Sequence, residues 1–418
     1  MFVYNKIIMT TVYDKNRMNY TFAQPESVKL LPTDLQQIPF DDQSYEEGRT
    51  MTLTFSSGGY YVDPEKSYIS LAVSITGNNS NALAVNWGKG SCANLFGGVR
   101  IYHKSGTQIT HNTNLDLWTK AKQYIEKDSF WFNTQGVVQG YLSDPYGAGQ
   151  VFWSTTQATP ETKNFKIKLC DLHPFFRGTE SKILSPQIID GLRIELDLNS
   201  KGRAFFTAVA SSPIVKYTVQ PSLQCALVDC QDQAADIIND IANKRGLQWE
   251  FNDVFITTVG IANNQNDFTV PLDKAVSLAQ NVITFTRNRL GDGSTGFDSH
   301  VYNEPSSNIK WNYRIANILY PYKRQVSNRL DTYTTLIDSF DWECGTNLSY
   351  DEWNEYNHCY TTLLRTEGHL MNTGIYLNSN KKVELEFQKE NSDDLLVHTC
   401  LEHRKLLTFN GVNSKIDV

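Results

Sequence analysis

Four residues near the end of the chain, His398, Cys400, Glu402 and His403, are of types that bind metal ions. Imidazole, thiolate and carboxylate groups are the usual ligands of zinc and other transition metals, and a site needs them to converge on one point. The surrounding segment reads as a β-strand, in which positions five apart point to opposite faces of the sheet. His398 and His403 would therefore diverge, and we predict no metal site here.

Two acidic groups raise the same question. Asp232, Asp236 and Asp240 fall at i, i+4 and i+8 of an expected helix, so they share one face. No histidine or further acid joins them, and a solvated helix face explains them. The loop "GDGSTGFDSH", with Asp292 and Asp298, faintly resembles a calcium loop but lacks the EF-hand spacing. The sequence predicts no metal or cofactor ligand.

Motifs for catalysis are missing in the same way. The chain contains no H-E-x-x-H and no G-x-S-x-G, so metalloprotease and serine-hydrolase signatures are absent. The glycine-rich stretch "NWGKGSCANLFGG" includes Lys89 but lacks the spacing of a phosphate-binding loop, and an ordinary loop leading into a strand explains it. A glycosidase would need two carboxylates brought together in space, which sequence alone does not establish. We predict no catalytic residue and no enzymatic activity.

The segment "RIANILYPYKRQ" could form a basic turn that binds a ligand, or it could have only a structural role. We expect Arg314–Leu319 to be a core strand that ends at Tyr320-Pro321, because proline cannot donate to a sheet ladder. The stripe Val326, Leu330, Tyr333, Ile337 and Phe340 predicts a helix from Val326 to Phe340. Lys323 and Arg324 then become solvated or intersubunit charges rather than a ligand site.

The composition indicates which elements position these residues. The chain has 418 residues, 40% of them hydrophobic and 20% charged, which suits two or three packed domains. Aromatic residues reach 12%, and aromatic and β-branched residues favour strands. The net charge of −7 gives no large basic field for sequence-independent binding to nucleic acid.

The cysteines and the lack of long apolar runs indicate in which cellular compartment the protein is made. Seven cysteines without a C-x-x-C pattern indicate reduced, buried thiols rather than a disulfide framework. The first residues lack the apolar stretch of a signal peptide, and no run of about 18 apolar residues predicts a membrane span. We expect the protein to be made inside a cell.

Short alternating segments dominate the chain from Thr50 onward. "TMTLTFSS" and "GLRIELDLNS" alternate apolar and polar residues, as half-buried antiparallel strands do. A strand around Arg100 and a strand around Arg314 are each followed by a helix-like stretch, which hints at two β-domains of similar topology. We expect an N-terminal arm over 1–48, a first domain over 49–230, and a second domain over 231–418 with a linking helix over 232–245.

Several segments taken together resemble the double jelly-roll major capsid proteins of icosahedral DNA viruses. They are "LHPFF…ILSPQII" before "GLRIELDLN", "SYISLAVSITG…NLFGGVRIYHKSGTQI", "NYRIANILYPYKRQVSNRLDTYTTLIDSF", "EGHLMNTGIYLNSNKKVELEFQ" and "LVHTCLEHRKLLTFNGVNSKIDV". The order and spacing of these pieces, which cover most of 50–418, carry the resemblance. In the virophage and Polinton-like (adintovirus) branch the last strand commonly has an acidic-aromatic ending, and Glu402-His403-Arg404-Lys405 departs from it.

The resemblance implies an all-β fold of two tandem eight-stranded antiparallel jelly rolls with short inserted helices. It also implies a homotrimer of pseudo-hexagonal shape in the virion, tiled into an icosahedral shell around DNA. Penton and minor capsid proteins, and in some virions an internal membrane, would be its neighbours; sequence-specific nucleic-acid binding is not expected. The alternatives are a non-enzymatic receptor- or carbohydrate-binding β-sandwich protein of a virion, and a β-sandwich enzyme such as a glycoside hydrolase.

Overall fold

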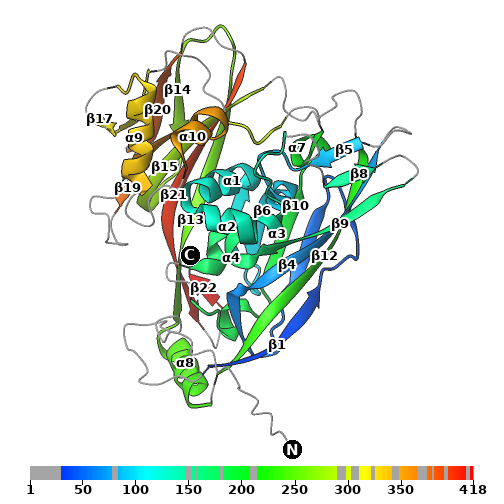
Figure 1. Cartoon of the computed structure of the whole chain (residues 1–418). Coiled ribbons are helices and arrows are strands. Elements are labelled where there is room, and N and C mark those ends of the chain that lie inside the picture. The colour runs from blue at the N-terminus through cyan, green and yellow to red at the C-terminus, as the bar shows by residue number, and fades with distance from the viewer. Residues whose placement is uncertain are drawn as a thin grey trace, which may run out of the picture.

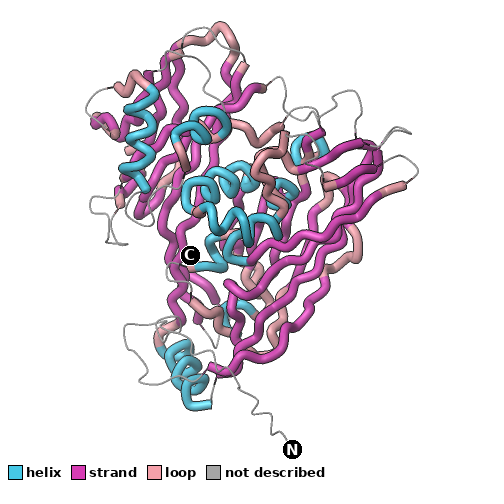
Figure 2. Tube along the Cα trace, viewed as in Figure 1, coloured by secondary structure: helices cyan, strands magenta, loops and turns pink. Residues whose placement is uncertain are grey.

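The computed structural model describes residues 30–77, 83–146, 152–155, 159–178, 182–207, 214–230, 232–289, 298–302, 310–321, 325–340, 348–364, 374–378, 381–389, 394–410 and 415–417 (Figures 1 and 2). Strands account for most of the regular structure, and the helices are short (Figure 2). None of the helices in these ranges combines the length and apolar character needed to cross a lipid bilayer.

The first half of the chain folds into two main antiparallel sheets. One has the order β1-β12-β4-β9, with β2 paired to β12, and the other has the order β3-β10-β6-β7. The strands are β1 (Leu30–Pro39), β2 (Tyr45–Glu46), β3 (Thr50–Thr54), β4 (Tyr61–Gly77), β5 (Leu83–Asn86), β6 (Phe96–Tyr102), β7 (Gln108–Thr113), β8 (Trp153–Thr155), β9 (Glu161–Lys168), β10 (Arg193–Leu198), β11 (Phe206–Thr207) and β12 (Ile214–Cys230). Strands β11, β5 and β8 form a small separate sheet. Two sheets of this strand order form a jelly roll.

The second half repeats this topology. Its sheets have the orders β13-β21-β15-β18, with β19 paired to β15 and β22 to β21, and β14-β20-β16-β17. The strands are β13 (Leu247–Ile261), β14 (Asp267–Leu272), β15 (Val276–Asn288), β16 (Lys310–Ile315), β17 (Ile318–Tyr320), β18 (Cys359–Leu363), β19 (Ile375–Leu377), β20 (Val383–Gln388), β21 (Leu395–Asn410) and β22 (Lys415–Asp417). Each strand of the orders β1-β12-β4-β9 and β3-β10-β6-β7 thus has a counterpart in the second half, for example β1 with β13, β12 with β21, and β7 with β17. The prediction of two jelly rolls in tandem is confirmed.

Short helices fill the connections. They are η2 (Cys92–Leu95), α1 (Leu115–Glu126), α2 (Ser129–Trp131), η3 (Phe132–Gly136), α3 (Val137–Gln139), α4 (Leu169–Leu172), α5 (Pro174–Arg177), α6 (Pro186–Ile189), α7 (Lys201–Ala204), α8 (Asp232–Lys244), α9 (Arg329–Phe340) and α10 (Tyr350–Tyr356). α1 follows β7, and α9 follows β17, so the helix expected after the central strand of each roll is present. α8 joins the rolls and ends before Gly246, whose φ of 77° suits glycine.

Alternation in the strands places one row of side chains in the core. Met51 and Leu53 of β3 and Ile194 and Leu196 of β10 are fully buried. Cross-strand pairing puts Ile194 opposite Leu53 and Leu196 opposite Met51, so the two rows meet on one face of the sheet. The predicted half-buried strands are confirmed here.

The expected N-terminal arm is wrong in its second half. Residues 30–39 form β1, an edge strand that pairs with β12. Leu30 lies opposite Cys230 at one end, and Pro39 lies opposite Ser222 at the other. Its prolines are compatible with a strand because β1 lies at the edge of its sheet. The first roll therefore begins at residue 30 rather than 49, and residues 1–29 lie outside the described part of the chain.

The expected core strand Arg314–Leu319 is also wrong. β16 ends at Ile315, the chain turns at Ala316 and Asn317, and β17 returns beside β16 with Ile315 opposite Ile318. Ala316 adopts a φ of 54°, a left-handed conformation in which an alanine gives no turn signal in the sequence. The expected strand end at Tyr320-Pro321 is confirmed.

The helix expected over Val326–Phe340 begins three residues later, as α9. Val326 instead forms a β-bridge with Trp311, and Leu330 is 66% exposed. The buried residues of α9 are Thr332, Thr335, Leu336, Ser339 and Phe340. The predicted apolar stripe of α9 is therefore confirmed at Phe340, with Tyr333 packed against the core, and is wrong at Val326 and Leu330. In α8, Ile238 is buried and Ile237 is 47% exposed.

Two hydrophobic clusters make up the core. The smaller belongs to the second roll alone and includes Val282, Val397 and Leu401. The larger combines the core of the first roll with residues of the second roll, among them Ile283, Phe285 and Cys400. Because neighbouring residues of β15 and β21 contribute to different clusters, both faces of the second roll's large sheet are buried, one of them against the first roll.

Candidate functional site

The residues singled out as metal candidates do not gather into a site. His398 receives a hydrogen bond from Arg287 Nε at 3.1 Å on Nε2, and its Nδ1 lies 2.8 Å from Thr258 Oγ1. Burial and the Arg287 charge hold the pKa of His398 well below its ordinary value, so the ring is neutral. Cys400 packs in the larger core cluster. Among the described residues no group of three or more histidines, cysteines or acids is close enough to hold an ion.

The other candidates separate in the same way. Asp236 and Asp240 are exposed on α8, where Asp240 pairs with Lys244 at 2.7 Å, as a solvated face predicts. Asp292, Lys323 and Arg324 lie outside the described ranges. The described cysteines are free thiols, and Cys344 also lies outside those ranges.

Many buried polar contacts of the described residues lie between the two rolls, at a contact that we call the seam. In Figure 1 it lies between α1 of the first roll and the sheet of β13 and β21. Its charged groups are buried or half-buried, and Asp116, Asp253 and Glu402 each have a hydrogen-bond partner across the contact. The seam therefore fixes how one roll is oriented against the other.

One part of the seam joins β7 to β13. Thr110 Oγ1 donates to Asp253 Oδ1 at 2.9 Å, and Asn112 Nδ2 donates to the same oxygen at 3.1 Å. His173 Nε2 lies 2.9 Å from Asn112 Oδ1, and its Nδ1 accepts the Phe175 amide. Burial lowers the pKa of His173 to about 4. A neutral imidazole with both nitrogens bonded is thus part of the join.

A second part joins α1 to β21 and is centred on Glu402. Trp118 Nε1 donates to Glu402 Oε1 at 3.2 Å, and Lys122 Nζ donates to Oε2 at 3.0 Å. Asn281 Nδ2 of β15 donates to the same Oε2 at 3.1 Å. Burial opposes the charge on Lys122, but Glu126 and Glu402 outweigh it and raise the pKa of Lys122 above its ordinary value. The ion pair is retained because both charges are compensated.

A third part surrounds Asp116 at the start of α1. Arg203 binds its carboxylate with two hydrogen bonds of 2.6 and 2.8 Å, and His300 Nε2 of the second roll lies 3.1 Å from Oδ2. Burial would raise the pKa of Asp116, but Arg203 and His300 more than offset it and hold the pKa far below the ordinary value. Asp116 is therefore a fully ionised anchor.

The glycine-rich stretch around Lys89 also lies at the seam. The Lys89 amide donates to Asp298 Oδ2 at 2.6 Å, and its Nζ lies 3.3 Å from Glu352 Oε1. Gly88 has a φ of 61°, and a Cβ there would lie 2.2 Å from Asp298 Oδ2. Glycine is required at 88 because the second roll's carboxylate packs against its backbone. The stretch is a structural loop, as the sequence indicated, but its role in joining the rolls was not foreseen.

Lys120 of α1 is enclosed between the rolls. Its Nζ donates to the Tyr356 carbonyl at 3.0 Å and lies 3.9 Å from the centre of the Tyr302 ring. Burial lowers the pKa of Lys120 to about 7. A lysine with such a pKa can act as a base, but its surroundings are protein groups that already occupy it, so it supports the join rather than a reaction.

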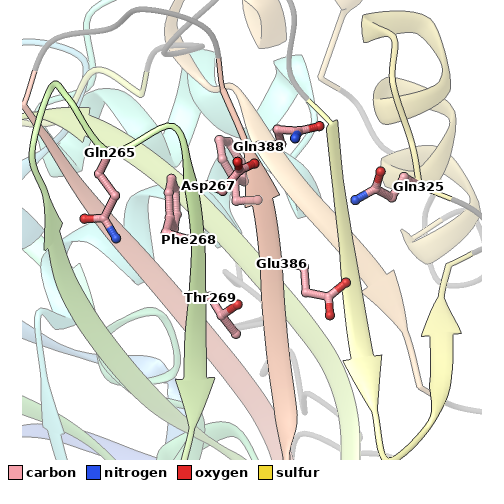
Figure 3. Close-up of a pocket in the computed structure, with 8 residues that line it drawn as sticks. Gln265, Asp267, Phe268, Thr269, Gln325, Glu386 and Gln388 are labelled. Carbon is pink, nitrogen blue, oxygen red and sulfur yellow. The ribbon is translucent and has the colours of Figure 1, made fainter.

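A hollow of about 460 Å³ opens on the outer face of β14 and β20 (Figure 3), lined by Gln265, Asp267, Phe268, Thr269, Gln325, Glu386, Phe387 and Gln388. Glu386 accepts hydrogen bonds from Arg314 and, at 3.0 Å, from Asn312. The Arg314 hydrogen bond lowers the pKa of Glu386. A glycosidase acid needs a raised pKa, so Glu386 is unsuited to that role.

Comparison with known proteins identifies the fold. No family model matches the chain, and no curated protein matches its sequence. Among solved structures it is similar to VP54 of PBCV-1, fitted into a reconstruction of the virophage Sputnik, with a TM-score of 0.65, 9% identity and coverage of 95% of this chain and 98% of that one. It is similar to the Faustovirus major capsid protein (TM-score 0.61, 8% identity, 93% and 92% covered) and to the mavirus major capsid protein (0.52, 8%, 92% and 89%). Over nearly its whole length, the chain has the double jelly-roll fold of these viral capsid proteins.

Proposed function

We propose that this chain is a major capsid protein that assembles as pseudo-hexagonal homotrimers, which tile an icosahedral virion shell around a DNA genome. The single observation that carries the proposal is the match in fold across two complete rolls, 95% of this chain against 98% of VP54. A fold alone does not determine a function. The proposal therefore also uses the contacts between the two rolls and the net charge of the chain.

The seam supports a structural role. A shell subunit must keep its two rolls in one orientation, because each subunit surface is used repeatedly in a symmetric assembly. Asp116, Asp253 and Glu402 are buried charges or acceptors with partners from the other roll, which makes the two rolls one body. The described residues offer no grouping suited to catalysis, and we propose that the protein is not an enzyme.

The proposed partners follow from the same role. They are further copies of the chain, penton and minor capsid proteins, and an internal membrane in virions that have one. The net charge of −7 argues against direct, sequence-independent binding to the genome. We propose domain limits on either side of α8, with one roll up to residue 230 and the other from residue 247.

The test is the assembly state of the purified full chain. Sedimentation velocity should give a stable species of three times 47.5 kDa, and electron microscopy should show pseudo-hexagonal capsomers that form larger shells under assembly conditions. A monomer that binds glycans on an array would overturn the proposal in favour of a receptor- or carbohydrate-binding protein.

A further inference from the structure

The hollow on the outer face of β14 and β20 lies away from the strands that join the rolls (Figure 3). The second roll contributes β13, β15 and β21 to the seam, through Asp253, Asn281 and Glu402. In contrast, β14 and β20 belong to its other sheet. The volume of about 460 Å³ falls within the usual range of ligand pockets, about 300–1,000 Å³. The contacts between the rolls therefore do not account for this hollow.

Alternation along two paired strands gives the hollow its polar wall. In β14, Asp267 and Thr269 are exposed on either side of the buried Phe268. In β20, Gln388 pairs in register with Asp267, and Glu386 pairs with Thr269. Residues two apart in a strand, and their directly paired neighbours, project on the same face of a sheet. Two carboxylates, one hydroxyl and one amide thus lie on adjacent positions of one surface.

Two more glutamines extend this polar surface on both sides. Gln265 precedes β14, and Gln325 precedes the residue that bridges to β16; both are exposed. In Figure 3, Gln265 lies beside Phe268 at one side of the hollow, and Gln325 lies at the opposite side, beyond Gln388. Each amide side chain has an acceptor oxygen and two N–H donors. The glutamines of the hollow can therefore both donate to and accept from a ligand.

The aromatic residues of the hollow lie in its floor. Phe268 and Phe387 are 7% and 2% exposed and belong to the core of the second roll. Their rings stack with centroids 5.0 Å apart, which makes the floor a packed layer. Because no ring is exposed there, a ligand would be held by hydrogen bonds rather than by stacking.

The charges around the hollow disfavour ions of either sign. Glu386 accepts hydrogen bonds from Arg314 and Asn312, so its charge is compensated and a cation would find only Asp267 as a carboxylate ligand. None of the residues lining the hollow is basic, so an anion such as phosphate or sulfate would meet Asp267 without a compensating charge. Lys310 is exposed on the neighbouring strand β16 but does not line the hollow. A neutral ligand rich in hydroxyl groups fits this combination.

We propose that the hollow binds a neutral hexopyranose unit of a glycan. Each sugar hydroxyl donates one hydrogen bond and can accept others, and two neighbouring hydroxyls can donate to both oxygens of one carboxylate, a role for Asp267. Thr269 and Gln388 would bond further hydroxyls, since each can donate and accept. The glycan is bound and not cleaved, because Glu386 is held by Arg314 and has no proton to give. The inference goes beyond the proposed function and does not depend on assembly.

The experiment titrates the full-length protein with the methyl glycosides of glucose, galactose and mannose, followed by saturation-transfer NMR. We expect at least one of them to bind with a dissociation constant on the order of 1 mM, because an open polar site gives only a few net hydrogen bonds. Thr269→Ala/Gln388→Ala should weaken this binding by at least about tenfold, since two of these hydrogen bonds are lost. Both side chains are exposed, so an unchanged thermal midpoint should show that the variant is folded.

The matched control makes the same two kinds of change in the first roll. Thr54 is exposed on β3, the counterpart of β14, and Gln108 is exposed on β7 of the same sheet. Thr54→Ala/Gln108→Ala should bind the glycoside as the wild type does, because neither residue lines the hollow.

Charge gives a second measurement. The uronic acid that corresponds to the bound hexoside differs from it only by a carboxylate at C6, and Asp267 would repel that group. The wild type should bind this acid at least about tenfold more weakly than the hexoside at low ionic strength. Asp267→Asn keeps an acceptor oxygen and removes the charge, so it should reduce the difference to less than about threefold.

Three results would overturn the inference: a wild type that binds none of the three glycosides, equal binding by the wild type and Thr269→Ala/Gln388→Ala, or a preference of the wild type for the uronic acid. Sedimentation of the same samples tests the proposed function separately. A trimer that binds no glycoside would overturn the sugar site alone. A monomer whose glycoside binding is lost in Thr269→Ala/Gln388→Ala would support the sugar site and overturn the proposed function.

Discussion

Trp118 and Glu402 are 284 residues apart in the chain, yet the indole Nε1 donates to the carboxylate Oε1 at 3.2 Å across the seam. Both side chains are buried, and Glu402 also binds Lys122 and Asn281. One carboxylate therefore satisfies three donors from both rolls. Its loss should weaken the join between the rolls more than the loss of any exposed ion pair.

Glu402→Ala is expected to lower the free energy of unfolding by about 3 kcal/mol, since it leaves the buried Trp118 and Asn281 donors without their acceptor and removes one of the two carboxylates that compensate Lys122. Glu402→Gln retains an oxygen for Trp118 and should have a smaller effect. Urea unfolding at pH 7 measures both. The control is Asp240→Ala, which breaks the exposed pair with Lys244 and should change stability by less than about 0.5 kcal/mol. Equal effects at 402 and 240 would contradict the account of the seam.

Gly88→Ala should be strongly destabilising. Its φ of 61° is unfavourable for alanine, and the new Cβ would lie 2.2 Å from Asp298 Oδ2, so the Asp298 carboxylate would have to move and lose its hydrogen bond from the Lys89 amide. We expect a loss of more than about 2 kcal/mol, read as a fall in the thermal midpoint. Gly106→Ala is the matched control, because its φ is 84° but nothing lies within 4 Å of its Cβ. Its effect should be limited to backbone strain of about 1 kcal/mol.

The sequence predicted the strands and the two-domain topology because these depend on local patterns. Ile194 and Leu196 alternate with Arg193 and Glu195, and the period of two alone assigns them to a strand. No local sequence pattern of this kind indicated which residues meet at the seam. Asp253, for example, lies in a strand whose sequence does not reveal that Thr110 and Asn112 approach it from another roll.

The failure of the predicted α9 stripe at Leu330 has a different physical cause. Thr332, Thr335 and Ser339 are buried because each hydroxyl donates to a backbone carbonyl three or four residues earlier, which satisfies it inside the helix. Thr332 Oγ1 also accepts a hydrogen bond from Trp311 Nε1 at 3.0 Å. Apolar periodicity selected Leu330 instead, and that residue is exposed in the single chain.

Acidification should destabilise the protein from about pH 6.5 downward. Burial lowers the pKa of His173 from 6.5 to about 4 and that of His358 to about 3. For a depressed pKa the unfolded chain binds more protons between the two values, so the stabilisation is complete above pH 6.5 and is lost as the pH falls toward the folded value. The urea midpoint should therefore fall between pH 7 and pH 5. In His173→Gln, which titrates no proton there, the fall should be shallower. An identical fall of the urea midpoint with pH in the variant would contradict a lowered pKa of His173 in the folded protein.

Lys120 should make the protein more stable as the pH rises from 7 to 8.5. Burial lowers its pKa to about 7, against an ordinary value of 10.5, while Asp298 and Glu352 partly oppose the shift. Above pH 7 the unfolded chain holds the lysine proton and the folded chain releases it, so stability increases with pH. Lys120→Met keeps the length of the side chain and removes the titrating group.

The measurement compares urea midpoints of the wild type and Lys120→Met at pH 7.0 and 8.5. The wild type should gain stability over this interval, and the variant should gain little, because the buried ammonium is the group whose proton is released. The interval stops at pH 8.5 because burial raises the pKa of Cys92, Cys359 and Cys400, and at higher pH the unfolded thiols ionise and oppose the gain. Lys127→Met is the matched control, since Lys127 is half-buried at the surface and pairs with Asp171 at 3.1 Å. A parallel rise in the wild type and Lys120→Met would mean that Lys120 keeps its proton between the rolls.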